Sequence, residues 1–153
     1  MPLNNFGKVN GSIDLYRAAQ PDNDGMMALV NLNFDVIFRL SGEHEGSLSL
    51  NDERKFTFNV IHRPLNEIFR KNEEQIVHGI VKEINDLLLI GQRILIHCSH
   101  GRDRTGLVVG AWQLLHGDML LHEVEKERAV YGVHGLIKFV DYQDEKILKS
   151  FEK

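Results

Sequence analysis

Cysteine is nearly absent from this sequence: Cys98 is the only one in 153 residues. A single thiol excludes an intramolecular disulfide and a zinc site built from several cysteines. No apolar run is long enough to span a bilayer, and the first residues lack the basic stretch and apolar core of a secretory signal. We therefore expect a reducing, cytoplasmic setting and no stable insertion into a membrane.

The chain also lacks an excess of charge of one sign. It holds 18 Lys and Arg against 22 Asp and Glu, for a net charge of -4, and this balance does not favour a nucleic-acid partner. Of its eight histidines only His97 and His100 lie close together, and this is not a metal-ligand spacing. We expect no metal site, and any anionic ligand must be attracted by local charge.

Internal repeats, low-complexity blocks and Pro/Ser-rich linkers are absent, and the length fits one domain over residues 1–153. Short apolar runs alternate with longer amphipathic stretches. Strands are expected at 15–17, 34–40, 56–61 and 94–96, and helices at 26–32, 73–88, 105–115, 120–132 and 136–151. This alternation predicts an α/β domain with a mostly parallel central sheet flanked by helices. We expect the domain to be a monomer.

The segment between strand 94–96 and helix 105–115 carries the residues suited to chemistry. Backbone N–H groups in such a strand–loop–helix turn can form a nest for an anion, and the helix N-terminus adds its positive dipole end. Gly101 supplies the conformational freedom of a tight loop, and Arg104 can place a planar charged fork on two phosphate oxygens. The residues expected to bind a substrate phosphate in this loop are Ser99, His100, Gly101, Arg102, Asp103 and Arg104.

Cys98 stands at the start of the same loop. A positive environment favours the thiolate form of a cysteine, and the thiolate is the nucleophilic form. A nucleophile on one side of a phosphate and hydrogen-bond donors around its oxygens is the arrangement that phosphoryl transfer requires. The residues therefore predict that Cys98 attacks a phosphate group held by Arg104 and the loop.

The ten residues from His97 to Gly106 resemble the active-site signature H-C-x-x-G-x-x-R-[ST]-G of the protein tyrosine phosphatase superfamily. The segment 15–21, Leu-Tyr-Arg-Ala-Ala-Gln-Pro, is similar to one found in the compact atypical dual-specificity and bacterial tyrosine phosphatases. The resemblance implies a phosphocysteine intermediate on Cys98, a hydrogen bond from Thr105 to the sulfur, and a supporting role for His97 in ordering the loop. It also implies that no metal or cofactor takes part.

The proton donor departs from the family pattern, which places an aspartate on a separate loop. Here the corresponding loop, residues 62–71, contains no aspartate. Glu67 is the nearest chemical substitute. Asp103 is the alternative, in the position where the myotubularin lipid phosphatases carry an aspartate, and Glu43 and Glu45 are more distant candidates.

The substrate class follows less directly from the sequence. A local group of basic residues suggests a rim that attracts anions. Its members are Arg63, Arg70, Lys71, His100 and Arg102. We expect a protein tyrosine or dual-specificity phosphatase acting on a phosphorylated protein. The alternatives are an inositol (poly)phosphate or phosphoinositide phosphatase, and a pseudophosphatase that binds phosphate without turnover.

Overall fold

A five-stranded sheet forms the centre of the computed structural model, which describes residues 3–65, 72–101, 103–131 and 138–152. The strands lie in the order β1-β2-β5-β3-β4, and all neighbours are parallel except β1 and β2. Their bounds are β1 (Gly7–Lys8), β2 (Leu15–Ala19), β3 (Val36–Arg39), β4 (Asn59–His62) and β5 (Ile94–Cys98). The predicted single α/β domain with a mostly parallel sheet is confirmed. Strand β1 was not predicted, because two residues carry no readable pattern of alternation.

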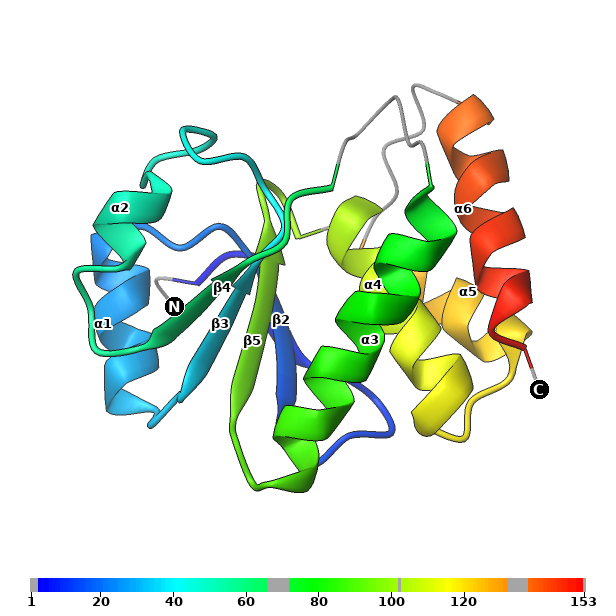
Figure 1. Cartoon of the computed structure of the whole chain (residues 1–153), viewed down its shortest axis with the longest axis horizontal. Helices are drawn as coiled ribbons and strands as arrows, with labels where there is room; N and C mark the ends of the chain where they lie inside the picture. The colour runs from blue at the N-terminus through cyan, green and yellow to red at the C-terminus, as the bar shows by residue number, and fades with distance from the viewer. Residues whose placement is uncertain (1–2, 66–71, 102, 132–137, 153) are drawn as a thin grey trace.

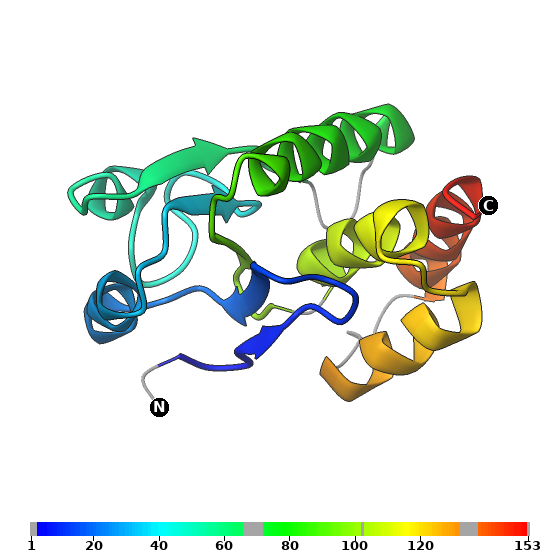
Figure 2. The same ribbon diagram turned by 90° about the horizontal axis from the view of Figure 1, so that it is seen from below.

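Helices cover both faces of the sheet (Figures 1 and 2). One face carries α1 (Asn23–Asn31) and α2 (Leu50–Glu53), and the other carries α3 (Glu73–Leu89), α4 (Asp103–His116), α5 (Leu121–Tyr131) and α6 (Lys138–Ser150). Each face has its own apolar cluster: Met26 and Ile37 belong to one, and Ile84 and Val108 to the other. Among the helices of the described residues, none has the length and apolar character to cross a membrane.

Strand β5 is the central strand, and all five of its residues are buried. Its continuous apolar run fits a parallel strand that is covered on both faces. In the register of the sheet Ala19 of β2 lies opposite Cys98, and Arg39 of β3 lies opposite His97. The carboxyl ends of three strands therefore meet around Cys98, at the edge of the sheet where open α/β folds bind ligands.

Candidate active site

Cys98 is the last residue of β5, and it is only 3% exposed. Thr105, in the first turn of α4, donates a hydrogen bond from Oγ1 to Cys98 Sγ at 3.0 Å. The contact forms because the loop between the two residues reverses the chain and brings the start of α4 beside the end of β5. The hydroxyl of Thr105 can thus stabilise negative charge on the sulfur.

The loop after Cys98 is held from outside through its carbonyl groups. The backbone N–H of Gln20 donates to the carbonyl of Ser99 at 3.1 Å, and Asn5 Nδ2 donates to the carbonyl of His100 at 3.1 Å. In a trans peptide the C=O and the following N–H point in opposite directions. The N–H groups of His100 and Gly101 therefore point away from these anchors, in the manner of an anion nest.

Gly101 has a left-handed backbone with φ of +71°, and it lies against the end of β2. A Cβ atom at this position would be 2.5 Å from the backbone carbon of Ala18 and 2.6 Å from the backbone nitrogen of Ala19. Both the conformation and the close approach exclude a side chain. The sequence predicts the conformational requirement, whereas the close approach arises only from the packing of β2 on the loop.

Arg104 is 2% exposed, and its guanidinium group makes a two-pronged ion pair with Glu45 from the β3–α2 loop. The distances are 3.1 Å from Nη1 to Oε1 and 2.5 Å from Nη2 to Oε2, and the hydroxyl of Ser99 donates to the same carboxylate. The hydrogen bond from Arg104 is the largest cause that lowers the pKa of Glu45, to about 2. Glu45 is therefore ionised at neutral pH in this arrangement and has no proton to donate. The same pair shows that Arg104 can bind two anionic oxygens at once.

His97 is fully buried beneath the loop, and its Nε2 lies 2.7 Å from Oε2 of the buried Glu53. Glu53 also accepts a hydrogen bond from Nη1 of the buried Arg39 at 2.9 Å. Burial raises the pKa of Glu53, but the hydrogen bonds and charges of His97 and Arg39 outweigh it, so the pKa lies below its usual value. Arg39 further donates to the backbone carbonyl of Glu45 at 2.7 Å. One buried network thus connects the start of the loop from Cys98 to Arg104, which we call the phosphate loop, to the loop that carries Glu45.

Glu53 and Arg39 are two site residues that the sequence did not predict. The sequence gives one weak indication of the role of Arg39, which ends an apolar strand. A charged residue in such a place is rarely buried unless it is paired. There is no such indication for Glu53, since it lies in a polar segment where solvated acids are common. Glu53 ends the short helix α2, which Ser49 and Asp52 cap with reciprocal hydrogen bonds.

The two candidates for the proton donor are not settled by geometry. Glu67 lies outside the described residues, and so does Arg102. Asp103 begins α4, but its side chain is outside the described part of the structure. The choice between Glu67 and Asp103 therefore stays a prediction.

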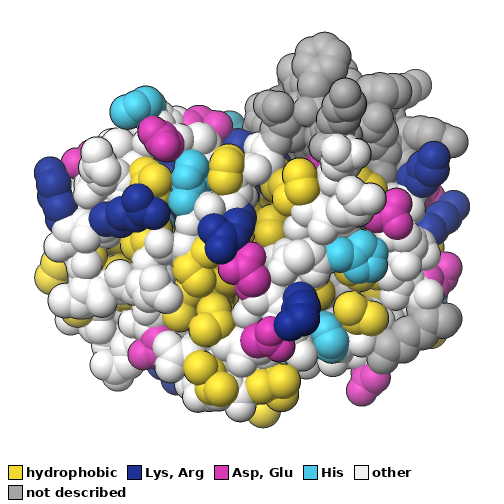
Figure 3. Space-filling view, in the orientation of Figure 1, with side chains coloured by type: hydrophobic (Ala, Val, Ile, Leu, Met, Phe, Trp, Pro, Cys, Tyr) yellow, Lys and Arg dark blue, Asp and Glu magenta, His cyan; other side chains and the backbone are white. Residues whose placement is uncertain are grey.

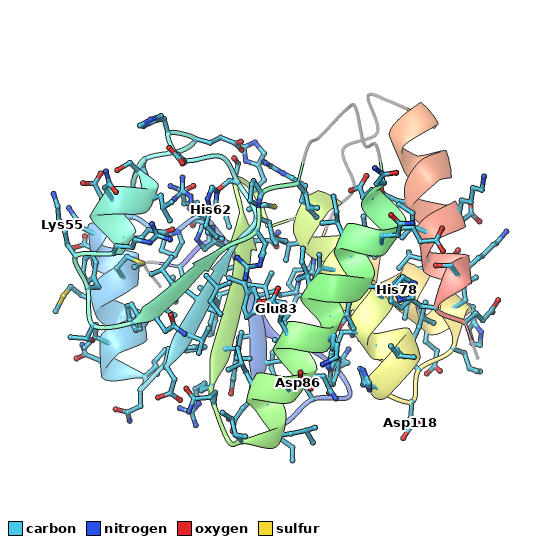
Figure 4. The ribbon with its side chains drawn as sticks, in the orientation of Figure 1. Lys55, His62, His78, Glu83, Asp86 and Asp118 are labelled. Atoms are coloured by element: carbon cyan, nitrogen blue, oxygen red, sulfur yellow. The ribbon has the colours of Figure 1, made fainter. Side chains whose placement is uncertain are left out.

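Of the predicted basic rim, the structure describes only Arg63 and His100. Arg63 makes a two-pronged ion pair with Glu83 of α3, with both N–O distances at 2.8 Å, and Figure 4 shows Glu83 on the side of α3 that faces β4. An arginine neutralised in this way attracts a distant anion only weakly. Arg70 and Lys71 lie outside the described residues. On the face seen in Figure 3, basic and acidic side chains are interspersed rather than gathered in patches of one sign.

Within the described ranges, no group of three His, Cys, Asp or Glu residues could hold a metal ion.

Fold and site together define a cysteine-dependent phosphatase, and the comparison with protein families agrees. The family model described as "Polymorphic toxin system, DSP-PTPase phosphatase" matches residues 11–118. The chain belongs to this family, so the predicted membership of the protein tyrosine phosphatase superfamily is confirmed. A search of curated proteins found no match.

Solved structures with the same fold include Tk-PTP, the PP-IP phosphatase SIW14 and TpbA. The active form of Tk-PTP is 24% identical, with a TM-score of 0.75, over 94% of this chain and 95% of that one. The core catalytic domain of the PP-IP phosphatase SIW14 from S. cerevisiae is 20% identical, with a TM-score of 0.77, over 99% of this chain and 88% of that one. P. aeruginosa TpbA, solved in complex with pTyr, is 14% identical, with a TM-score of 0.73, over 96% of this chain and 90% of that one. At these identities the likeness establishes the fold alone.

Proposed function

We propose that this protein hydrolyses phosphate monoesters through a phosphocysteine on Cys98. The sulfur attacks phosphorus, an S–P bond forms, and the P–O bond to the alcohol breaks while an acid protonates the leaving oxygen. The conjugate base of that acid then takes a proton from water, the water oxygen attacks phosphorus, and the S–P bond breaks, which releases inorganic phosphate and restores the thiolate. Arg104 binds two phosphoryl oxygens, and Thr105 stabilises the sulfur as it leaves. The single observation that carries this proposal is the 3.0 Å hydrogen bond from Thr105 to Cys98 at the base of the loop that ends in Arg104.

We propose a phosphotyrosyl or dual-specificity protein phosphatase rather than an inositol-phosphate phosphatase. The family description names a DSP-PTPase, and TpbA, which shares the fold, was solved with pTyr. The Arg63–Glu83 pair weakens the argument for a polyanionic substrate, because it removes one member of the basic rim. The second candidate, an inositol-phosphate substrate, draws its support from the shared fold of the PP-IP phosphatase SIW14. The lone cysteine favours action in the reducing cytoplasm.

A phosphate-release panel tests the substrate class. Phosphotyrosine, phosphoserine and phosphothreonine peptides would be compared with inositol polyphosphates, using wild type and the Cys98→Ser variant as the blank. We expect the highest kcat/KM on a phosphotyrosine peptide. A higher value on an inositol polyphosphate would support the second candidate. Tight phosphopeptide binding with no turnover on any substrate would indicate a pseudophosphatase.

The proton donor is tested by Glu67→Gln and Asp103→Asn, each made alone. Substitution of the true donor should lower kcat on an alkyl phosphate by about 10²- to 10⁴-fold, the usual contribution of a positioned acid. The loss should be much smaller on an aryl phosphate with a good leaving group, because such an oxygen leaves without a proton. If neither variant discriminates between the two substrates, both assignments are wrong.

Glu45→Gln tests whether the carboxylate competes with phosphate for Arg104. An exposed or half-exposed ion pair contributes roughly 1 kcal/mol at most, so the neutral amide should tighten inhibition by vanadate about fivefold. Glutamine keeps the length of the side chain and its acceptor oxygen, and it removes only the charge. Weaker inhibition by vanadate would instead mean that Glu45 orients Arg104 for the substrate.

A further inference from the structure

Arg17, in the middle of β2, is 1% exposed and lies behind the phosphate loop. Its Nη2 donates to the carbonyl of Gly101 at 3.1 Å, and its guanidinium carbon lies 3.8 Å from the centroid of the Tyr131 ring. Its Nε and Nη1 have no hydrogen-bond partner in the described part of the chain. Burial lowers the pKa of Arg17 to about 10, so the group keeps its charge at neutral pH. A buried cation with this few partners is costly, and such a cost usually marks a functional requirement.

Asn5 contacts the same loop from the N-terminal segment. Its Nδ2 lies within hydrogen-bond distance of three carbonyls, those of His100 at 3.1 Å, Gly101 at 3.3 Å and Tyr131 at 3.2 Å. Its backbone is left-handed, with φ of +54°, which asparagine tolerates better than most residues. Figure 2 shows the N-terminal segment beside the end of α5 that carries Tyr131.

From these contacts we infer that Asn5 and Arg17, with Tyr131, form a rear brace that positions the phosphate loop for the proposed phosphatase reaction. Asn5 and Arg17 are positioning residues, since they act on the peptide groups of the loop and not on the substrate. By holding the carbonyls of His100 and Gly101 from behind, they keep the N–H of Gly101 turned toward the anion site.

The brace also places a positive charge near the nucleophile. In the register of the sheet Arg17 of β2 lies opposite Ile96 of β5, two residues before Cys98. The ring of Tyr131 covers the guanidinium group and keeps water away from it. Arg17 therefore adds a buried positive charge beside the loop that begins at Cys98.

Asn5→Gly tests the geometric half of the inference. Glycine keeps the left-handed backbone and removes only the amide that reaches the loop. We expect kcat to fall by about 10- to 100-fold with a smaller change in KM, as for a displacement of about 1 Å in a preorganised site. The matched control is Asn33→Gly: Asn33 is exposed and has φ of +60°, and it follows α1 at the opposite end of the strands. It should leave kcat unchanged.

Arg17→Met and Arg17→Lys test the electrostatic half. Methionine keeps the bulk beside Tyr131 and removes the charge, so alkylation of Cys98 by iodoacetamide at about pH 6 should slow by about tenfold or more. Lysine keeps the charge and lacks the planar guanidinium group. Arg17→Lys should therefore recover most of the alkylation rate that Arg17→Met loses, but it should not recover kcat. Thermal unfolding would verify that each variant is folded.

Unchanged kcat in Asn5→Gly, together with equal alkylation rates in wild type and Arg17→Met, would overturn the inference. Alkylation does not depend on turnover. If wild type shows no phosphatase activity, the proposed function fails, while the alkylation rates still report on the brace. If wild type is active and neither half of the test responds, the brace alone is wrong.

Discussion

Cys98→Ser should reduce phosphate release from an aryl phosphate by at least about 10⁴-fold, the scale on which removal of a nucleophile acts. Cys98 is 3% exposed, and its sulfur accepts a hydrogen bond from Thr105 in a loop whose N–H groups and helix end favour an anion. A serine hydroxyl is not ionised at neutral pH in the same surroundings, so the attacking anion is lost. The measurement is phosphate release under single-turnover conditions, with enzyme in excess.

The substituted protein should still bind phosphate esters, because Arg104 and the loop are unchanged. Calorimetric titration with a phosphotyrosine peptide provides this control, and it separates a lost nucleophile from a collapsed loop. Alkylation provides a second control, since the chain has one cysteine and one equivalent of reagent should abolish activity. Residual turnover above about 1% of wild type would show that another group attacks phosphorus.

Arg104→Lys should lower kcat/KM by about 10³-fold, with most of the loss in kcat. Lysine keeps a positive charge but loses the planar fork, and the Glu45 pair shows that Arg104 uses both terminal nitrogens on two oxygens at once. Charge stabilisation by a positioned arginine in phosphoryl transfer contributes about 10³- to 10⁵-fold, and lysine recovers part of it.

Arg93→Lys is the matched control for this substitution. Arg93 pairs with Asp14 at 3.2 Å beside the start of β5, at the opposite end of the sheet from Cys98. A half-exposed pair of this kind contributes little, so kcat/KM should stay within about twofold of wild type. Equal losses in both variants would mean that Arg104→Lys acts through general destabilisation and not through the phosphate.

Much of the fold followed from local pattern. The apolar run of β5 and the helical periodicity of α3 each belong to one continuous segment, so hydrophobic spacing alone placed them within a few residues of their observed bounds. The short β1 could not be predicted in this way. It exists because its backbone pairs with β2, and a two-residue strand has no pattern of its own.

The sequence by itself determined the nucleophile and the phosphate-binding arginine as candidates, because Cys98 and Arg104 belong to one short loop whose spacing and context are local. Only the tertiary structure decided what surrounds that loop. Asn5 reaches the carbonyl of His100 across 95 positions of sequence, and Glu45 reaches Arg104 across 59. Such contacts depend on how the strands are ordered and how their ends meet, and no spacing along the chain encodes that distance. For the same reason the ion pair with Arg104, which keeps Glu45 ionised, depends on the placement of β3 beside β5 in the sheet.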